Sequence, residues 1–326
     1  MQQRISERHT FAAFFRRVKT GEKPGYPRFK GVGHFDTVEF PKDGDGCRWD
    51  STPDAPVTRQ GIGHVRVHQH RPVKGRVKTI SIKREGRRWY VILACDRIPS
   101  EPLPQTGSIV GIDVGTVHFF TDYHGVHVEN PRFLGAMAQE LAAAQRHLST
   151  FLKHAKRRTK RHQAASRKVA RIHAKIRRQR LDHHHKVALA LVREHEVIGH
   201  EKLNTAGMTR SPASKPDPDK NGALLPNGAA AKAGLNRSIL DAGWALFLGI
   251  LAQKAESAAR RVIPVDARNT SRTCPLSAGG WGHVAAENRV TQAKFECVTC
   301  GFVDNADRVG ALNVLNRAGL VLCAEA

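Results

Sequence analysis

Apolar and polar residues alternate along much of the first hundred positions, a period of two that predicts antiparallel β-strands. Gly86 divides the clearest stretch, 76–96, and predicts a hairpin turn between two strands. The alternating apolar positions are Val65, Val67, Val77, Ile80, Ile82, Tyr90 and Ile92. The sequence EPLPQTG at 101–107 indicates a linker, so we predict a β-rich domain over residues 1–106.

A continuous apolar run replaces this alternation immediately after the linker. The sequence SIVGIDVG (108–115) predicts a buried strand that ends in a tight turn, and two more strands are predicted on either side of 123–125. Further strands are predicted at 196–203 and 261–265. This order predicts an α/β domain that opens with successive hairpins, as an RNase H-like fold does.

Helical spacing of apolar residues dominates the segment between these strands. Residues 133–195 contain no proline and a single glycine, and they predict a helical hairpin or a long bent helix. Residues 204–234 are rich in Gly, Pro, Ser and Ala and predict a mobile loop. An amphipathic helix capped by Asn236 or Ser238 is predicted to follow the loop.

Three acidic residues lie where a catalytic metal site would draw its ligands. Asp113 is inside an apolar strand, Glu201 ends a predicted strand, and Asp307 opens a predicted final helix. An acid in an apolar strand is costly to bury unless it is paired or bound to metal. Each acid also has an ordinary structural interpretation: a strand-end turn, a solvent-facing terminus, or a favoured helix start, for which Asp304 competes.

The three acids together predict one centre, because a strand, a strand end and a helix start of one α/β domain can point to a shared place. Phosphodiester cleavage with two divalent ions needs hard oxygen ligands that hold the ions ~3.5–4 Å apart. We therefore predict a two-metal catalytic site at Asp113, Glu201 and Asp307.

Three of the six cysteines gather in one short C-terminal stretch, 274–300, which is not the spread of a disulfide framework. Cys297 and Cys300 form a CxxCG turn that presents two thiolates to one metal, and Cys274 supplies a third sulfur. Ser277 stands where a second upstream cysteine is expected, and His283 is the candidate fourth ligand. A structural zinc site is predicted. A redox pair and a metal-free ribbon held by packing are the alternatives.

The charge balance indicates a polyanionic partner. Lysine and arginine exceed acidic residues by 24 in the 326-residue chain, and such a surplus causes strong self-repulsion unless a polyanion such as nucleic acid neutralises it. No stretch approaches the ~18 consecutive apolar residues of a transmembrane helix, and the N-terminus lacks the apolar region of a signal peptide. We expect an intracellular, cytoplasmic, nucleoid-associated protein without membrane contact.

The basic residues are most concentrated over 151–180, which holds 13 lysines and arginines and no acid. We predict that this segment contacts nucleic-acid phosphates, and a solvated helix face is the alternative. The candidate binding residues are Lys156, Arg157, Arg158, Lys160, Arg161, Arg177, Arg178 and Arg180.

Five strings occur here in the order in which they are found in one known family. They are FFRRVKTGEKPGYPRFKG (14–31), GIDVG (111–115), HEKLN (200–204), RNTSRTCP (268–275) and CVTCGFVDNADRVGALNVL (297–315). In these strings the chain resembles the TnpB/OrfB proteins of bacterial insertion sequences, which are related to type V CRISPR effectors. The resemblance covers nearly the whole chain, and its C-terminal block is the most specific part.

This resemblance implies RNA-guided, Mg²⁺-dependent DNA cleavage by a RuvC-like, RNase H-like domain, with guide RNA and target DNA as partners. It implies that Asp113, Glu201 and Asp307 hold the metals and that an inserted ribbon holds zinc. The implied domains are a partial β-barrel of the wedge type at 1–106, a nuclease core at 107–269 with a helical insertion at 133–195, a zinc-ribbon-like insertion at 270–303 and a C-terminal helix at 304–326.

The chain departs from the family pattern at its beginning, because the family normally has a further N-terminal portion before the string at 14–31. We therefore expect an N-terminally shortened member. Two other functions stay open: a truncated nucleic-acid-binding protein without guided cleavage, and a DNA-strand transferase, since RNase H-like transposases also use acidic triads.

Overall fold

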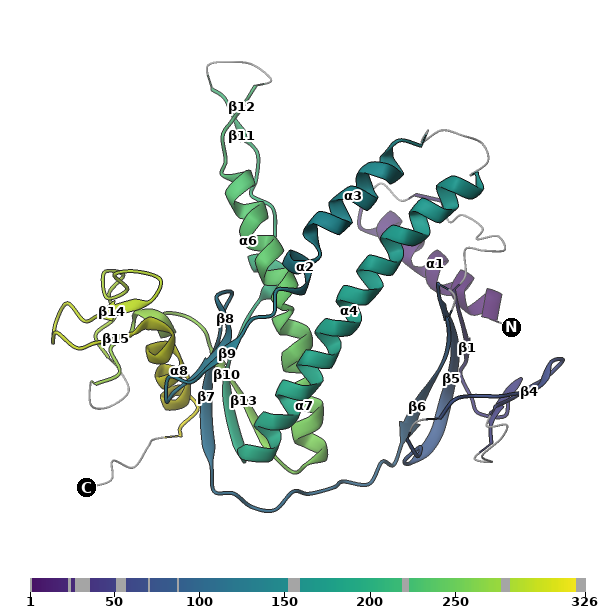
Figure 1. The fold of residues 1–326 in the computed structure, drawn as a ribbon, viewed down its shortest axis with the longest axis horizontal. Helices are drawn as coiled ribbons and strands as arrows, with labels where there is room; N and C mark the ends of the chain where they lie inside the picture. Colours follow the sequence, from purple (N-terminus) through teal and green to yellow (C-terminus); the bar gives the residue numbers. More distant parts are fainter. Residues whose placement is uncertain are drawn as a thin grey trace. The chain divides into compact units, whose positions relative to one another are not determined.

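A computed structural model describes the chain in several stretches and divides it into two compact units, Met1–Pro99 and Ser100–Ala326 (Figure 1). The described residues are 2–22, 25–26, 36–50, 57–69, 71–86, 88–151, 159–218, 223–276 and 282–320. Lys156, Arg157, Arg158 and Ser277 therefore lie outside them, and nothing structural is said of these four.

The first unit contains helix α1 (Gln2–Lys19) and two antiparallel three-stranded sheets. One sheet has the order β1-β5-β6, and the other has the order β2-β3-β4. The strands are β1 (Thr37–Phe40), β2 (Cys47–Trp49), β3 (Val57–Arg59), β4 (Gly63–Val65), β5 (Arg76–Glu85) and β6 (Arg88–Asp96). The predicted hairpin at Gly86 is confirmed, since this residue has φ 63° between β5 and β6.

The second unit is built on a mixed five-stranded sheet with the order β13-β10-β7-β8-β9. Its strands are β7 (Ile109–Val114), β8 (His118–Asp122), β9 (His127–Glu129), β10 (Val197–Lys202) and β13 (Arg261–Asp266). β7, β8 and β9 pair antiparallel, whereas β10 and β13 run parallel to β7. The predicted α/β class and all five strands are confirmed.

Helices cover both faces of this sheet, with α8 (Ala306–Arg317) on one face and α4 (Lys160–Glu194) and α7 (Trp244–Ser257) on the other (Figure 1). The main core lies between the sheet and the pair α4 and α7, and it includes Ile112 and Phe247. Gly111, next along β7, meets α8 instead, where an added Cβ would collide with the carbonyl oxygen of Ala311. Alternation along the strand therefore turns Asp113 toward α8.

The segment 133–195 forms the predicted helical hairpin, with α2 (Phe133–Ala136) and α3 (Ala138–Ser149) leading to α4. Leu141 and Ala144 of α3 pack against Ile172 and Ile176 of α4 in a small core of their own. This hairpin extends away from the sheet, so most of the basic face of α4 lies outside the main core (Figure 1).

Two expectations for residues 204–257 are wrong. The predicted loop contains helix α5 (Thr205–Met208) and a ribbon of β11 (Lys215–Pro216) and β12 (Leu224–Leu225). The single predicted helix is two, α6 (Ala229–Ala242) and α7, because Gly243 adopts φ 70° between them. The helices therefore begin after Gly228 and Gly243, and neither Asn236 nor Ser238 is a cap.

In the described part of the chain, one helical stretch, Ala229–Ser257, is long and apolar enough to cross a membrane by composition. It comprises α6 and α7, and several apolar side chains of α7, among them Trp244, Phe247 and Leu251, are buried in the main core. Core packing of these side chains accounts for part of its apolar character.

The C-terminal part carries a short 3₁₀ turn, η1 (Thr270–Arg272), and the two-stranded ribbon β14 (Lys294–Glu296) and β15 (Val303–Asn305). Phe295 of β14 is fully buried in a separate core with Ala306 and Val309 of α8. This packing joins the ribbon to the helix that carries Asp307.

Candidate active site

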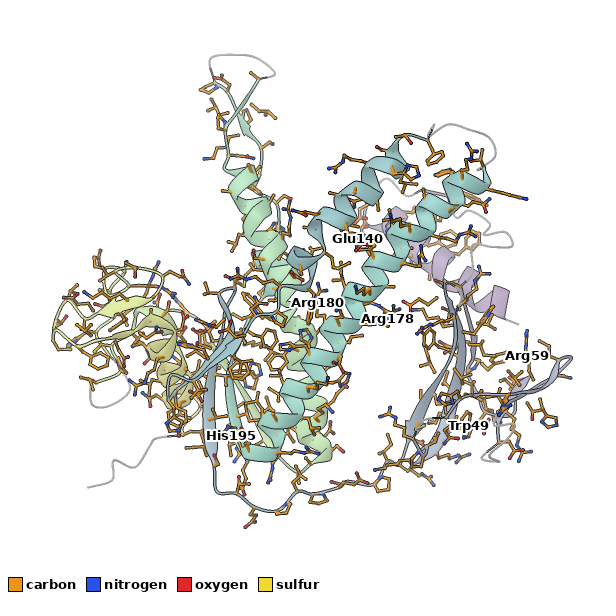
Figure 2. All side chains as sticks on the ribbon, viewed as in Figure 1. Trp49, Arg59, Glu140, Arg178, Arg180 and His195 are labelled. Carbon is orange, nitrogen blue, oxygen red and sulfur yellow. The ribbon has the colours of Figure 1, made fainter. Side chains whose placement is uncertain are left out.

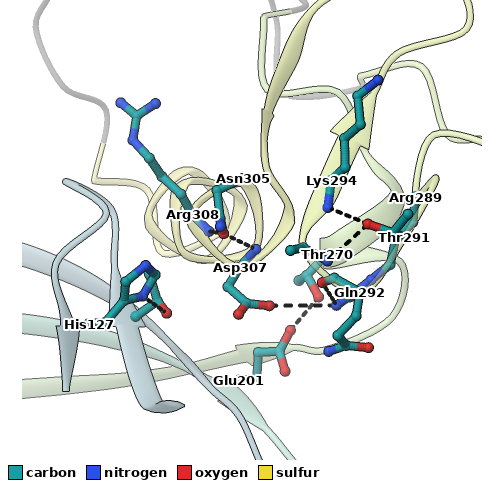
Figure 3. Close-up of polar contacts among 12 residues, drawn as sticks. His127, Glu201, Thr270, Arg289, Thr291, Gln292, Lys294, Asn305, Asp307 and Arg308 are labelled. Atoms are coloured by element: carbon teal, nitrogen blue, oxygen red, sulfur yellow. Dashed lines mark hydrogen bonds and ion pairs between the residues drawn. The ribbon is translucent and has the colours of Figure 1, made fainter. Parts of the chain in front are cut away.

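Asp113, Glu201 and Asp307 lie close together at the carboxyl ends of β7 and β10, beside the first turn of α8. Figure 3 shows Glu201 and Asp307 of this cluster. The parallel register that pairs His200 with Ile112 brings the next two residues, Glu201 and Asp113, to neighbouring positions on the same face. α8 approaches so closely that a Cβ on Gly310 would lie 2.6 Å from Asp113 Oδ2.

The pKa values of two acids in this cluster are raised. Burial raises the pKa of Asp113 well above its ordinary value, and the charges of Glu201 and Asp307 add to that effect. Burial also raises the pKa of Glu201, although a hydrogen bond from Thr270 and nearby arginines oppose it. Acids that share a buried site in this way favour a bound cation, which relieves their repulsion.

Thr270 fixes the orientation of Glu201, because its hydroxyl donates a hydrogen bond to Glu201 Oε1 (Figure 3). The turn that carries Thr270 is held in place by Asn313 of α8. The Asn313 amide, only 4% exposed, donates to the carbonyl oxygens of Thr270 and Thr273, each at 2.7 Å. Sequence reasoning identified the surrounding string but assigned no role to Thr270.

Arg289 reaches the acids from the segment that precedes β14, with its Nη2 3.5 Å from Asp307 Oδ1 (Figure 3). Its side chain is 24% exposed and that of Asp307 is 20% exposed, so the pair is partly shielded from water. Its positive charge also opposes the raised pKa of Asp113 and Glu201. Sequence reasoning missed this residue, since nothing in its local sequence signals contact with Asp307.

The Sγ atoms of Cys274, Cys297 and Cys300 lie within 4.8 Å of one another, and those of Cys274 and Cys300 are 3.5 Å apart. A tetrahedral zinc with bonds of ~2.3 Å places its sulfur ligands ~3.8 Å apart, so the spacing fits this metal. Burial opposes ionisation of Cys297, but the backbone N–H groups of Cys300 and Thr299 donate to its sulfur and lower its pKa to about 6. Cys297 therefore favours the thiolate, whereas burial raises the pKa of Cys274 to about 11.

His283 is not placed with these sulfurs in the described part of the chain. Its carbonyl oxygen accepts hydrogen bonds from the Cys274 N–H and the Asn288 side-chain amide, each at 3.0 Å. The three thiols thus form the predicted cluster, without a fourth described ligand.

Two family profiles match the chain: "Probable transposase" (OrfB_IS605) at residues 79–212 and "Cas12f1-like, TNB domain" at residues 244–314. The chain is 32% identical over 328 residues to "Putative RNA-guided DNA endonuclease InsQ" of Escherichia coli K12, covering all of this chain and 76% of that protein. The chain belongs to the TnpB/OrfB family.

A second relative of this TnpB-family chain is a "Putative RNA-guided DNA endonuclease" of Streptomyces pristinaespiralis, 32% identical over 247 residues, which cover 76% of this chain and 53% of that protein. Among solved structures, "Cryo-EM structure of the Cas12f1-sgRNA-target DNA complex" aligns with a TM-score of 0.42 and 15% identity over 92% of this chain and 74% of that one. "Structure of the mini-RNA-guided endonuclease CRISPR-Cas_phi3" aligns with a TM-score of 0.44 and 11% identity, over 74% of this chain and 51% of that one.

Four of the predicted phosphate-binding residues, Lys160, Arg161, Arg177 and Arg178, are exposed on α4. Arg180 differs from them, because its Nη2 lies 2.8 Å from Asp241 of α6 and its side chain is 20% exposed. Figure 2 marks Arg178 and Arg180 along this helix. Arg180 thus connects two helices of the fold, which leaves the other four as the surface candidates.

Proposed function

We propose that this TnpB-family chain is an RNA-guided DNA endonuclease whose RNase H-like, RuvC-like centre consists of Asp113, Glu201 and Asp307. The convergence of the three acids at one end of the sheet carries this proposal. The strand order supports it, because three antiparallel strands followed by two parallel ones is the arrangement expected of an RNase H-like core.

The donor set suits Mg²⁺, since the three side chains offer hard carboxylate oxygens and their charges repel one another without a cation. Two such ions, when bound, supply activation of the attacking water and stabilisation of the leaving oxygen. Thr270 keeps the Glu201 carboxylate in a fixed orientation. Arg289 provides a positive charge beside Asp307, where the scissile phosphate would bring negative charge.

A structural zinc at Cys274, Cys297 and Cys300 belongs to the same proposal. The ribbon that carries these thiols packs on α8 through Phe295, Ala306 and Val309. A metal that stiffens the ribbon would therefore also stabilise the start of α8, where Asp307 lies, and the approach of Arg289.

Guide RNA and target DNA are the proposed partners. The exposed Lys160, Arg161, Arg177 and Arg178 of α4 would contact their phosphates, which contributes affinity but no sequence readout. Sequence would be read by base pairing between guide and target, as in other RNA-guided nucleases.

The deciding experiment begins with the full chain purified from cells that carry its own insertion sequence, followed by sequencing of the RNA that accompanies it. We expect one defined small RNA, and Mg²⁺-dependent cutting of DNA that matches it. An Asp113→Ala protein should carry the same RNA and cut nothing. A random RNA mixture, or equal cutting by wild type and variant, would refute the proposal. Binding without any cutting would favour a nucleic-acid-binding protein.

A further inference from the structure

A cavity of about 320 Å³ opens beside the turn between β7 and β8, enclosed by the chain before α2 and by α6. This volume lies at the lower end of the ~300–1,000 Å³ that is typical of ligand sites. Apolar atoms form most of the lining, and the polar side chains that line the rest include Thr116, Asn130, Arg132, Arg237 and Ser238. Sequence analysis assigned no role to the first four, and it considered Ser238 only as a helix cap.

The acid in the cavity wall is already neutralised. Asp241 is 8% exposed, and its carboxylate accepts hydrogen bonds from the N–H groups of Leu134 and Gly135 and from Arg180. Within the stretches that the structure describes, neither Arg132 nor Arg237 forms an ion pair with a carboxylate, and both side chains are exposed. The cavity therefore has a positive balance, from the Arg237 side chain and from the Arg132 guanidinium, whose Nη2 donates a hydrogen bond to the Thr116 carbonyl oxygen at 3.5 Å.

The backbone before α2 is held in an unfavourable conformation that presents one of these groups. Arg132 has φ 47° and ψ 51°, a left-handed conformation that non-glycine residues rarely adopt. Asn130 maintains it: its Oδ1 accepts from the Arg132 N–H at 3.2 Å, and its amide donates to the Thr116 carbonyl oxygen at 2.9 Å. Strain of this kind is typical of ligand-binding positions.

The cavity lies close to the catalytic cluster along the chain. Thr116 is three residues beyond Asp113, so their Cα atoms are at most ~11 Å apart. A strand whose scissile phosphate lies at Asp113 would therefore bring a neighbouring phosphate within reach of the cavity.

We propose that this cavity binds a backbone phosphodiester of the nucleic-acid strand that enters the catalytic site, held by Arg132 and Arg237 with Asn130 and Ser238 beside them. Two guanidinium forks suit the oxygens of one phosphate. Val117 offers an apolar surface to the attached sugar. This role rests on the proposed function only in naming the strand, because the binding itself requires no cleavage.

The test compares the wild-type chain with the double variant Arg132→Gln and Arg237→Gln. The matched control removes two charges at the other end of the sheet, with Arg193→Gln and Arg261→Gln, which are exposed at the end of α4 and the start of β13. Binding of a fluorescein-labelled oligothymidylate is measured by anisotropy over a series of NaCl concentrations without Mg²⁺, so that the DNA remains intact.

We expect the plot of log Kd against log salt to flatten by about 0.7 in the cavity variant, the contribution of one single-strand phosphate, with no change in the control. In the cleavage assay, the cavity variant should need about tenfold more DNA for half-maximal rate, at an unchanged maximal rate. Equal slopes for wild type and cavity variant, or equal flattening in the control, would overturn the proposal. If wild type cuts no DNA, the salt series still decides the question of the cavity.

Discussion

Gly310 offers a sharp test of the catalytic geometry, because it lies in the middle of α8 directly against Asp113. A methyl group added there would stand 2.6 Å from Asp113 Oδ2 and 3.0 Å from Cγ, whereas ordinary contacts begin at 3.4 Å. Retreat of α8 would break its close packing on β7, where Gly111 lies against Ala311 and Leu315. The Asp113 carboxylate would have to move instead.

The expected effects on activity and stability have opposite signs. Displacing a catalytic group by ~1 Å costs about 100-fold in rate, so Gly310→Ala should cut DNA about 100 times more slowly. Alanine is about 1 kcal/mol more favourable than glycine inside a helix, which offsets the cost of moving one side chain. We therefore expect a Tm within about 4 °C of the wild type. The measurements are single-turnover cleavage and thermal unfolding.

Gly249 of α7 provides the matched control, since a Cβ there would meet nothing within 4 Å. Gly249→Ala should raise Tm by a few degrees at most and leave the cleavage rate unchanged. If Gly310→Ala cuts as fast as Gly249→Ala, the close contact between α8 and Asp113 has no catalytic consequence, and the proposed centre is incorrect.

Four further predictions test the surroundings of the site. Because folding raises the pKa of Asp113, the metal-free native state binds a proton more tightly than the unfolded chain, and its stability falls as pH rises toward that raised pKa. Asp113→Asn should remove this pH dependence of stability and raise Tm at neutral pH, as followed by chemical unfolding and calorimetry. Parallel stability–pH profiles for wild type and variant would contradict this expectation. Thr270→Val should lower the free energy of unfolding by about 1–3 kcal/mol and raise the Mg²⁺ concentration that cutting needs. Thr270→Ser keeps the hydroxyl, so both quantities should stay close to the wild-type values. Arg289→Gln should lower Tm more in metal-free buffer than in Mg²⁺, since a cation can replace the lost charge; an equal loss in both buffers would oppose this. Cys297→Ser should abolish zinc binding, measured by metal analysis of the purified chain, and an unchanged zinc content would exclude the thiol cluster as the site.

Local pattern determined much of this protein. Strand periodicity is set by residues a few positions apart, so the sequence was sufficient to predict β7 to β10, β13 and the hairpin at Gly86. The CxxCG turn is also a local feature, since Cys297 and Cys300 are three positions apart, and it was sufficient to predict a thiol cluster. The positions of Asp113 and Glu201 on strands also followed, and the convergence of the acids was a reasonable prediction from the fold class.

Local pattern failed where a single residue changes the path of the chain. The apolar spacing of 239–251 continues across Gly243, so the sequence predicted one helix. In the structure Gly243 has φ 70°, and a Cβ there would lie 3.1 Å from Arg180 Cδ and 3.1 Å from His184 Cε1. Packing between α4 and the α6–α7 junction, which is remote in sequence, decides this break.

Tertiary structure alone decided which other residues join the acids. Arg289 lies 18 positions before Asp307 in a segment without periodicity, and it reaches that acid because the ribbon packs on α8. Asp241 accepts hydrogen bonds from the backbone of α2 and from Arg180 of α4. Its negative charge is therefore neutralised, and Arg132 and Arg237 supply the positive charge that lines the cavity. Such contacts depend on where distant elements pack, whereas periodicity records only which face of one element is buried.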